Sequence, residues 1–177
     1  MTGKDRKVKL AVFKLSSCSG CQQQILDLGE SLLALANRVE IAYFLEASSK
    51  TSSGPYDVAL IEGSISTPHE EELVKEIRKQ ARVVVAVGSC ATYGGIQALR
   101  NWLNFSEVKK TVYPNPEWIE SLKKSSPLSD YIQVDYSVSG CPANKLQLLG
   151  TLKQILIGKR ASVSYTHLRA HETSLHL

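Results

Sequence analysis

The sequence lacks any uninterrupted apolar run of about 18 residues or more, so no segment of it is predicted to span a membrane. Its first stretch, residues 1–7, is charged and lacks the apolar core of a secretory signal, and we expect a cytoplasmic location. The net charge is only +4, and no stripe of Lys and Arg with interleaved aromatics is visible. Nucleic-acid binding therefore has little support.

Cysteine is also scarce, with four in 177 residues, but its placement is informative. Cys18 and Cys21 form a C-x2-C pair, and Cys90 and Cys141 stand alone. Each set follows an apolar run and lies in a turn that contains glycine. In the cytoplasm, paired cysteines more often bind metal or do redox chemistry than form structural disulfides. Four thiolates from three turns suit a cubane iron–sulfur cluster or a tetrahedral metal ion.

Predicted strands alternate with predicted helices along the chain. We expect strands at residues 7–15, 39–45, 57–61, 82–87 and 131–138. We expect helices at residues 22–37, 68–80 and 143–157, with Thr67 as the N-cap of the second and Pro142 in the first turn of the third. This alternation predicts an α/β fold, a flavodoxin-like, doubly wound, mostly parallel five-stranded sheet with helices on both faces.

Residues 1–160 are predicted to form a single iron–sulfur domain with an insertion at about 101–130. The insertion is rich in aromatics, prolines and lysines, and we expect a short helix near 117–124. Aromatics beside lysines suit a surface that docks a partner, although a loop packed on its own aromatics fits equally well.

The last stretch, residues 161–177, resembles a translated adapter sequence and is predicted to be foreign to the protein. It carries three of the four histidines. His167 and His171 have the i, i+4 spacing of a zinc helix, but no third ligand is evident, so we assign them no role.

The three cysteine turns follow the predicted first, fourth and fifth strands. In a doubly wound sheet the carboxyl ends of the strands meet at one edge, where ligands bind. We expect Gly20, Gly88 and Gly140, each next to or near a cysteine, to let the backbone approach a bound cluster. Glu62 ends the third strand at the same edge. We consider it a possible proton relay or an anchor for a neighbouring group, with capping of the next turn as the structural alternative.

Several interpretations of the cysteines remain open at this point. A structural zinc uses the same ligands, but it usually takes them from two local C-x2-C knuckles. A thioredoxin-type dithiol explains the first pair and leaves Cys90 and Cys141 without a role. Either lone cysteine, taken by itself, also suits the core. The wide separation of Cys90 and Cys141 from the pair favours an iron–sulfur cluster.

Four segments resemble the small subunit of cytoplasmic nickel–iron hydrogenases, of the sulfhydrogenase delta type. These segments are residues 17–22, 61–64, 87–96 and 139–145, and the similarity extends over about 6–160. The related 20-kDa subunit of NADH:ubiquinone oxidoreductase carries adjacent cysteines at the first site, whereas two residues separate Cys18 from Cys21.

The resemblance implies that Cys18, Cys21, Cys90 and Cys141 bind one proximal [4Fe-4S] cluster. Electrons would pass between the nickel–iron centre of a partner large subunit and flavin- and NAD(P)-binding subunits. The chain would then be a hydrogenase subunit with no catalytic residue of its own. Sulfhydrogenase delta subunits look longer and have more cysteines, so a truncated C-terminus is expected, with a naturally short form that holds a single cluster as the alternative. The alternatives are a quinone-module electron-transfer subunit of the 20-kDa type and a zinc-stabilised interaction module.

Overall fold

The computed structural model describes residues 6–31 and 38–158. Its centre is a sheet of five strands in the order β2-β1-β3-β4-β5, and every pair is parallel. The strands are β1 (Val8–Lys14), β2 (Val39–Phe44), β3 (Tyr56–Glu62), β4 (Ala81–Val87) and β5 (Tyr136–Val138). This is the flavodoxin-like strand order, so the predicted fold class is confirmed.

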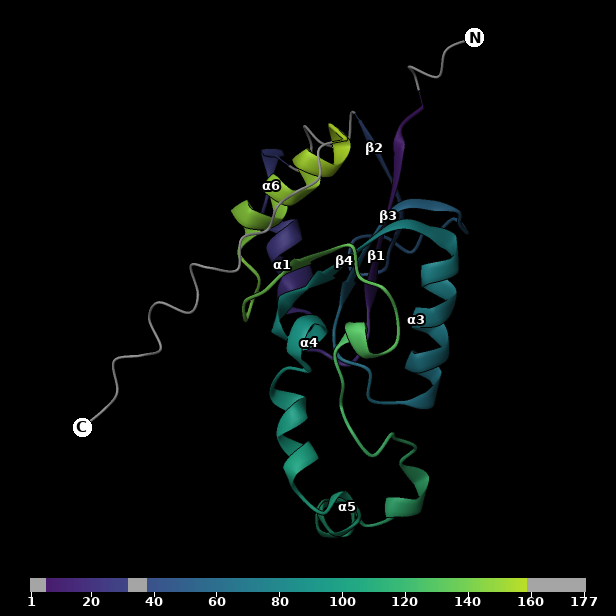
Figure 1. The fold of residues 1–177 in the computed structure, drawn as a ribbon, viewed down its shortest axis with the longest axis vertical. Coiled ribbons are helices and arrows are strands. Elements are labelled where there is room, and N and C mark those ends of the chain that lie inside the picture. The colour runs from purple at the N-terminus through teal and green to yellow at the C-terminus, as the bar shows by residue number, and fades with distance from the viewer. Residues whose placement is uncertain (1–5, 32–37, 159–177) are drawn as a thin grey trace, which may run out of the picture.

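Helices cover both faces of the sheet (Figure 1). One face packs against α3 (Pro68–Gln80), whose Val74 and Ile77 belong to one buried cluster. The other face packs against α1 (Gly20–Leu26) and α6 (Lys145–Leu156), which contribute Ile25 and Leu148 to a second cluster. The central strands β3 and β4 lie between these two layers. Their near-continuous apolar sequences follow from burial on both sides.

Helix α3 begins and ends where the sequence predicted. Thr67 accepts a hydrogen bond from the Glu70 amide at 3.2 Å, and the Glu70 carboxylate accepts one from the Thr67 amide at 3.0 Å. This reciprocal pair is a capping box, and Pro68 occupies the first turn, where its missing N–H is not needed.

The helix predicted over residues 22–37 is wrong in its extent. Helix α1 starts earlier, at Gly20, and ends at Leu26. A turn follows in which Gly29 has a φ of 53°, a left-handed conformation that interrupts a helix and that glycine adopts at little cost. The apolar period continues past this break, which is why it suggested one helix. Residues 32–37 lie outside the described part of the chain.

Strand β5 is also shorter than the predicted 131–138. It pairs with β4 only from Tyr136 to Val138. The preceding residue, Asp135, accepts the Val84 amide with its side chain at 2.7 Å and forms an ion pair with Arg78 at 2.6 Å. The Asp135 carboxylate thus accepts a hydrogen bond from the Val84 amide, which a longer β5 would have bonded with its backbone. A short 3-10 turn, Leu128–Asp130, comes just before the predicted strand.

Helix α6 begins at Lys145, two residues after its predicted start. Asn144 is the N-cap, and its side chain accepts the amides of Leu146 and Gln147. Pro142 therefore lies before the helix and not in its first turn as predicted. It is joined to Cys141 by a cis peptide bond.

Beyond β4, a helix that was not predicted, α4 (Gly88–Tyr93), leads into a segment that projects past the carboxyl edge of the sheet (Figure 1). We call residues 96–124 the arm. It contains η1 (Ile96–Trp102), α5 (Phe105–Val112) and η2 (Pro116–Trp118).

The helix predicted near 117–124 is wrong. The Leu122 amide donates to the Ser66 carbonyl at 2.8 Å, and Lys109 Nζ donates to the Ile119 carbonyl at 2.6 Å. The Ser66 carbonyl joins the returning chain to the body of the protein and Lys109 joins it to α5, so these backbone groups do not form a helical ladder.

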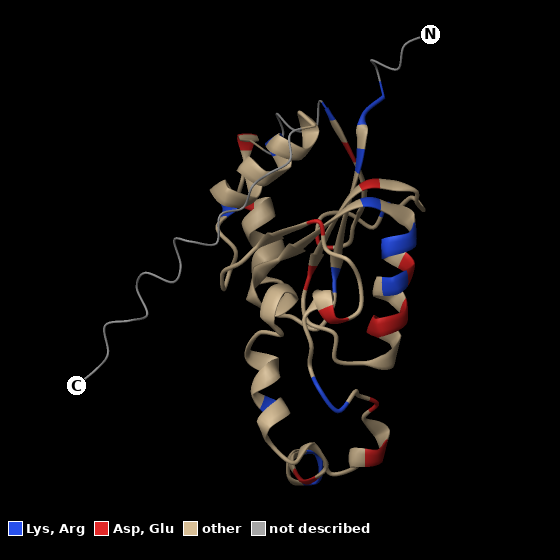
Figure 2. Ribbon diagram, in the orientation of Figure 1, with Lys and Arg blue, Asp and Glu red and all other residues tan. Residues whose placement is uncertain are grey.

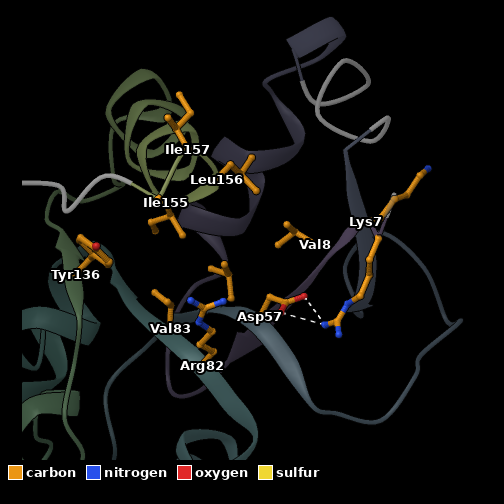
Figure 3. A pocket seen from close by; sticks show the side chains of 12 residues that line it. Lys7, Val8, Asp57, Arg82, Val83, Tyr136, Ile155, Leu156 and Ile157 are labelled. Atoms are coloured by element: carbon orange, nitrogen blue, oxygen red, sulfur yellow. Dashed lines mark hydrogen bonds and ion pairs between the residues drawn. The ribbon is translucent and has the colours of Figure 1, made fainter. Parts of the chain in front are cut away.

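The amino edge of the sheet carries a cavity of about 610 Å³ (Figure 3). Apolar side chains from the end of α6, such as Ile155, face Val8 across it. Asp57, which pairs with Arg6 at 2.9 Å, and Arg82 supply its charge. This cavity lies at the opposite end of the strands from the cysteines. Among the described residues, no helix has both the length and the apolar character needed to cross a membrane. The stretch predicted to be foreign, 161–177, lies outside the described residues.

Candidate metal centre at the carboxyl edge

The three cysteine turns follow strands β1, β4 and β5, and all three lie at the carboxyl edge of the sheet. Strands β1 and β3 lie side by side although the chain visits β2 between them, so this edge contains the switch in strand order. A row of paired residues crosses the sheet there. Lys14 pairs with Glu62, Glu62 with Val87, and Val87 with Val138. The turns therefore leave the sheet at the same level, as the sequence predicted.

Hydrogen bonds join the three turns to one another. The Ser89 amide donates to the Gly140 carbonyl at 2.8 Å, which links the turn after β4 to that after β5. The Ala143 amide donates to Cys21 Sγ at 3.4 Å, which links the turn after β5 to that after β1. The three turns thus form one connected unit.

Cys21 is the buried member of the set, with 7% of its surface exposed. The pKa of its thiol is raised to about 11, chiefly by burial and also by nearby Glu62 and Cys90, against the lowering effect of the Ala143 amide. Gly88 lies against its sulfur: a Cβ built on Gly88 would overlap Cys21 Sγ. Gly88 also has a φ of 84°, so two independent constraints select glycine there.

Cys90, in α4, is half-buried and contacts the start of the arm. Its Sγ donates to Gln97 Oε1 at 3.5 Å, while Gln97 Nε2 donates to the Ser16 carbonyl at 2.7 Å. Gln97 therefore bridges the turn after β1 and the cysteine of α4. Burial raises the pKa of the Cys90 thiol, and the neighbouring Cys141 and Cys18 raise it too.

Cys18 and Cys141 are exposed and form the open rim of the site. A negative charge on Cys18 raises the pKa of both Cys21 and Cys90, and a negative charge on Cys141 raises the pKa of Cys90. All four predicted sulfur ligands thus lie within electrostatic reach of at least one other. In the described part of the chain, no three or more His, Cys, Asp or Glu side chains are arranged to hold a single metal ion.

Glycine backbone lies close to several of the sulfurs, and one buried hydroxyl at this edge has no partner among the described atoms. A Cβ on Gly20 would lie 3.3 Å from Cys18 Sγ, and one on Gly95 would lie 2.6 Å from Cys90 Sγ. Gly140 is constrained by its own turn, where a Cβ would meet the Pro142 carbonyl. The Ser139 hydroxyl is buried and has no hydrogen-bond partner among the described atoms. A buried donor without a partner suits a bound polar group.

Glu62 lies where the sequence placed it, at the end of β3, and only 3% of it is exposed. Its two oxygens accept the backbone amides of Cys21 and Gln22, at 3.2 and 3.1 Å. Burial raises the pKa of this carboxyl, and the two amides counteract that rise.

Sequence reasoning missed three contributors to the site. Gln97 and Gly95 follow the cysteine of α4 within a few residues, and the glycine pair at 94–95 was a visible signal of close packing. The Ala143 amide gave no signal, because a backbone donor is defined by the turn that presents it and not by its side chain.

The fold and the cysteine edge together define a class of α/β domain that presents four thiols at a sheet switch point. The chain belongs to the family described as NADH ubiquinone oxidoreductase, 20 Kd subunit, whose sequence model matches residues 18–155.

Individual relatives are hydrogenase subunits. Sulfhydrogenase 2 subunit delta of Pyrococcus furiosus is 36% identical over 85% of this chain and 63% of its own length. A subunit of the F420-non-reducing hydrogenase vhu of Methanococcus voltae is 36% identical over 86% of this chain and 58% of its own length. The chain thus spans about three fifths of the length of these relatives.

A solved structure supports the same relationship. A chain of the NAD+-reducing [NiFe]-hydrogenase in the H2-reduced state superposes with a TM-score of 0.83 and 30% identity, covering 93% of this chain and 99% of that chain. The resemblance to hydrogenase small subunits stated from the cysteine motifs is therefore confirmed.

The contrast in burial predicts an order of thiol reactivity in the metal-free chain. Thiolates react with iodoacetamide and thiols do not, and at pH 8 a group with a pKa of about 11 is ionised in about one molecule per thousand. We expect exposed Cys18 and Cys141 to be alkylated first and Cys21 last, with the Cys21 rate rising as the pH approaches 11. Peptide mass spectrometry over time would measure this. Equal rates for Cys21 and Cys18 at pH 8 would contradict it.

The packing of Gly88 against Cys21 predicts a local cost for any side chain. We expect Gly88→Ala to lower the free energy of unfolding by about 1–3 kcal/mol, through the left-handed φ and the overlap with sulfur. Gly150→Ala, inside α6, is the matched control, since its Cβ would meet nothing within 4 Å. There alanine should be neutral or stabilising by up to about 1 kcal/mol. Urea unfolding of both variants measures the difference, and equal free energies would refute the packing argument.

Proposed function

We propose that this chain is the electron-transfer small subunit of a nickel–iron hydrogenase and holds one proximal [4Fe-4S] cluster. Cys18, Cys21, Cys90 and Cys141 would be its ligands. The observation that carries this proposal is that the three turns bearing the four cysteines, which are far apart in the sequence, all lie at one edge of a parallel sheet and are joined by hydrogen bonds. When bound, such a cluster supplies one-electron oxidation and reduction.

The chain's own residues suit this group in three ways. Four thiols match the all-cysteine ligation of a [4Fe-4S] cluster. Glycines at 20, 88 and 95 keep side chains away from the sulfurs. The buried Ser139 hydroxyl and the Gln97 amide add polar groups of the kind that tune a cluster's potential. Burial on the Cys21 side keeps water from the base of the site, while the Cys18–Cys141 rim stays open to a partner.

A zinc-stabilised interaction module is the alternative of another class. A structural zinc usually takes its four ligands from two local C-x2-C knuckles, and only Cys18 and Cys21 form such a knuckle. Cys90 and Cys141 come from separate segments after β4 and β5, and glycine backbone lies against three of the sulfurs. This arrangement favours the larger cluster. The quinone-module alternative shares the family, but the two residues between Cys18 and Cys21 favour the hydrogenase branch.

The proposed partners are a hydrogenase large subunit, which would carry the nickel–iron centre, and flavin- and NAD(P)-binding subunits. The names of the sulfhydrogenase and NAD+-reducing relatives support this choice. A cytoplasmic location remains a prediction. Glu62 as a proton relay also remains a prediction.

The arm is the surface that we propose docks the large subunit. It begins next to Cys90, which contacts Gln97, and it carries several exposed apolar side chains: Ile96, Leu99, Trp102, Leu103 and Trp118. Trp102 and Trp118 are 82% and 76% exposed, and tryptophan is enriched at the centres of interfaces. Helices α1 and α4 beside the rim carry no charge, whereas both signs gather on α3 (Figure 2).

The arm is anchored well enough to present a defined surface. The Arg100 guanidinium lies 4.5 Å from the Phe105 ring and donates to the carbonyl of Leu122 at 3.2 Å. Asn101 and Ser125 exchange two hydrogen bonds of 2.8 Å. These contacts join the outgoing and returning parts of the arm.

Anaerobic reconstitution with iron and sulfide tests the cluster. We expect about four irons per chain and a broad absorption that dithionite bleaches. Cys90→Ser should remove most of that iron, because the cluster would lose a thiolate. Thr92→Ser, in the same helix, keeps its hydroxyl and should load normally. One zinc per chain without colour, or full loading of Cys90→Ser, would contradict the ligand assignment.

Co-purification with a nickel-containing large subunit tests the arm. We expect Trp102→Ser to weaken capture of the large subunit at least about tenfold, as truncation of an interface hot spot does, without changing iron content. Ile157→Ser is the control, because Ile157 is 67% exposed but lies at the opposite edge. Equal capture by the two variants would show that the arm is not the docking surface.

A further inference from the structure

We propose that Glu62 is a positioning residue that holds the Cys18–Cys21 turn in place for the cluster. The inference rests on the proposed function, because it concerns how one ligand of that cluster is held. It assigns Glu62 a role through the backbone of Cys21 and Gln22 and not through contact with the reacting electrons.

The first argument is the place of Glu62 in the sheet. It ends the central strand β3, paired with Lys14 of β1 on one side and Val87 of β4 on the other. Its backbone is therefore held from both sides, and its side chain is almost entirely buried. A carboxylate on such a rigid base can hold a neighbouring turn at a defined position.

The second argument is what the start of α1 lacks. The first amides of a helix have no partner inside the helix and need a cap. Ser19, in the N-cap position, is left-handed with a φ of 66° and makes no side-chain cap bond. Its hydroxyl donates instead to Glu46 at 2.9 Å. The two oxygens of Glu62 take over this task from another strand, one for the Cys21 amide and one for the Gln22 amide.

The third argument is the direction of the other contacts on Cys21. The Ala143 amide and the bare backbone of Gly88 lie against its sulfur, and Glu62 holds its backbone. The sulfur is therefore enclosed by the turns after β4 and β5, while β3 holds the main chain. Removing Glu62 would free the main chain and leave the sulfur without a defined position.

Two measurements on the metal-free chain test the role directly. In the wild type, hydrogen exchange should show the Cys21 and Gln22 amides protected, unlike ordinary first-turn amides. Glu62→Gln keeps the shape and one acceptor oxygen but places its NH2 group against the other amide donor. We expect the amide that loses its acceptor to exchange about tenfold faster. Asp57→Asn is the matched control. Asp57 lies on the same strand, at the opposite edge, and accepts the Lys9 amide at 2.8 Å, so the Cys21 and Gln22 amides should keep their protection.

A third measurement uses the iron-loaded chain. We expect Glu62→Gln to release iron to a chelator several-fold faster than the wild type and Asp57→Asn do. We also expect the electron paramagnetic resonance spectrum of its reduced cluster to be broader. Unprotected wild-type amides, or unchanged exchange and iron release in Glu62→Gln, would overturn the positioning role. A wild type that takes up no iron but shows the predicted exchange would instead refute the proposed function and leave the cap intact.

Discussion

Parallel pairing at the centre of the sheet is the constraint on which the site depends. Lys14, Glu62, Val87 and Val138 form one continuous row across β1, β3, β4 and β5. The residues after this row leave the sheet together, so turns from distant parts of the sequence meet. A shift in the register of β5 would move its turn along the strand axis and break the bonds between Ser89 and Gly140 and between Ala143 and Cys21.

The site that results is asymmetric. Cys21 and Glu62 lie at its buried base, whereas Cys18 and Cys141 lie at an exposed rim. Low solvent access at the base raises the pKa of the Cys21 thiol and makes every unpaired polar group there costly, which explains why the turn amides are capped. If the proposed cluster binds here, an exposed rim would allow a partner protein to approach it closely, as electron transfer between proteins requires.

The opposite edge of the sheet shows what the fold does where no turns of this kind meet. There Arg6 and Asp57 pair, and apolar residues of α6 line a cavity (Figure 3). Both edges belong to the same strands, so the difference arises from the turns. The cysteines therefore lie in the turns that follow the strands, and the sheet holds these turns in position.

Much of the architecture was accessible from the sequence, because strong local signals agreed with the tertiary structure. The Thr67 capping box and the apolar run of β4 are examples.

Predictions failed where distant contacts took over backbone groups. Asp135 shortened β5 by taking the Val84 amide, and Ser66 held the chain near Leu122 out of a helix. Helix α1 ended at Leu26, and a turn with a left-handed Gly29 followed it despite a continuing apolar period. The sequence by itself determined the fold class, the four cysteines and the edge of the sheet at which they lie. Strand order and turn positions follow from local patterns of apolar residues and glycine. Only the tertiary structure decided which sulfur is buried, that Glu62 caps the turn of Cys21, and that Gln97 joins Ser16 to Cys90. Those relations depend on side chains and amides brought together across the sheet, and no local pattern in the chain encodes the distance between them.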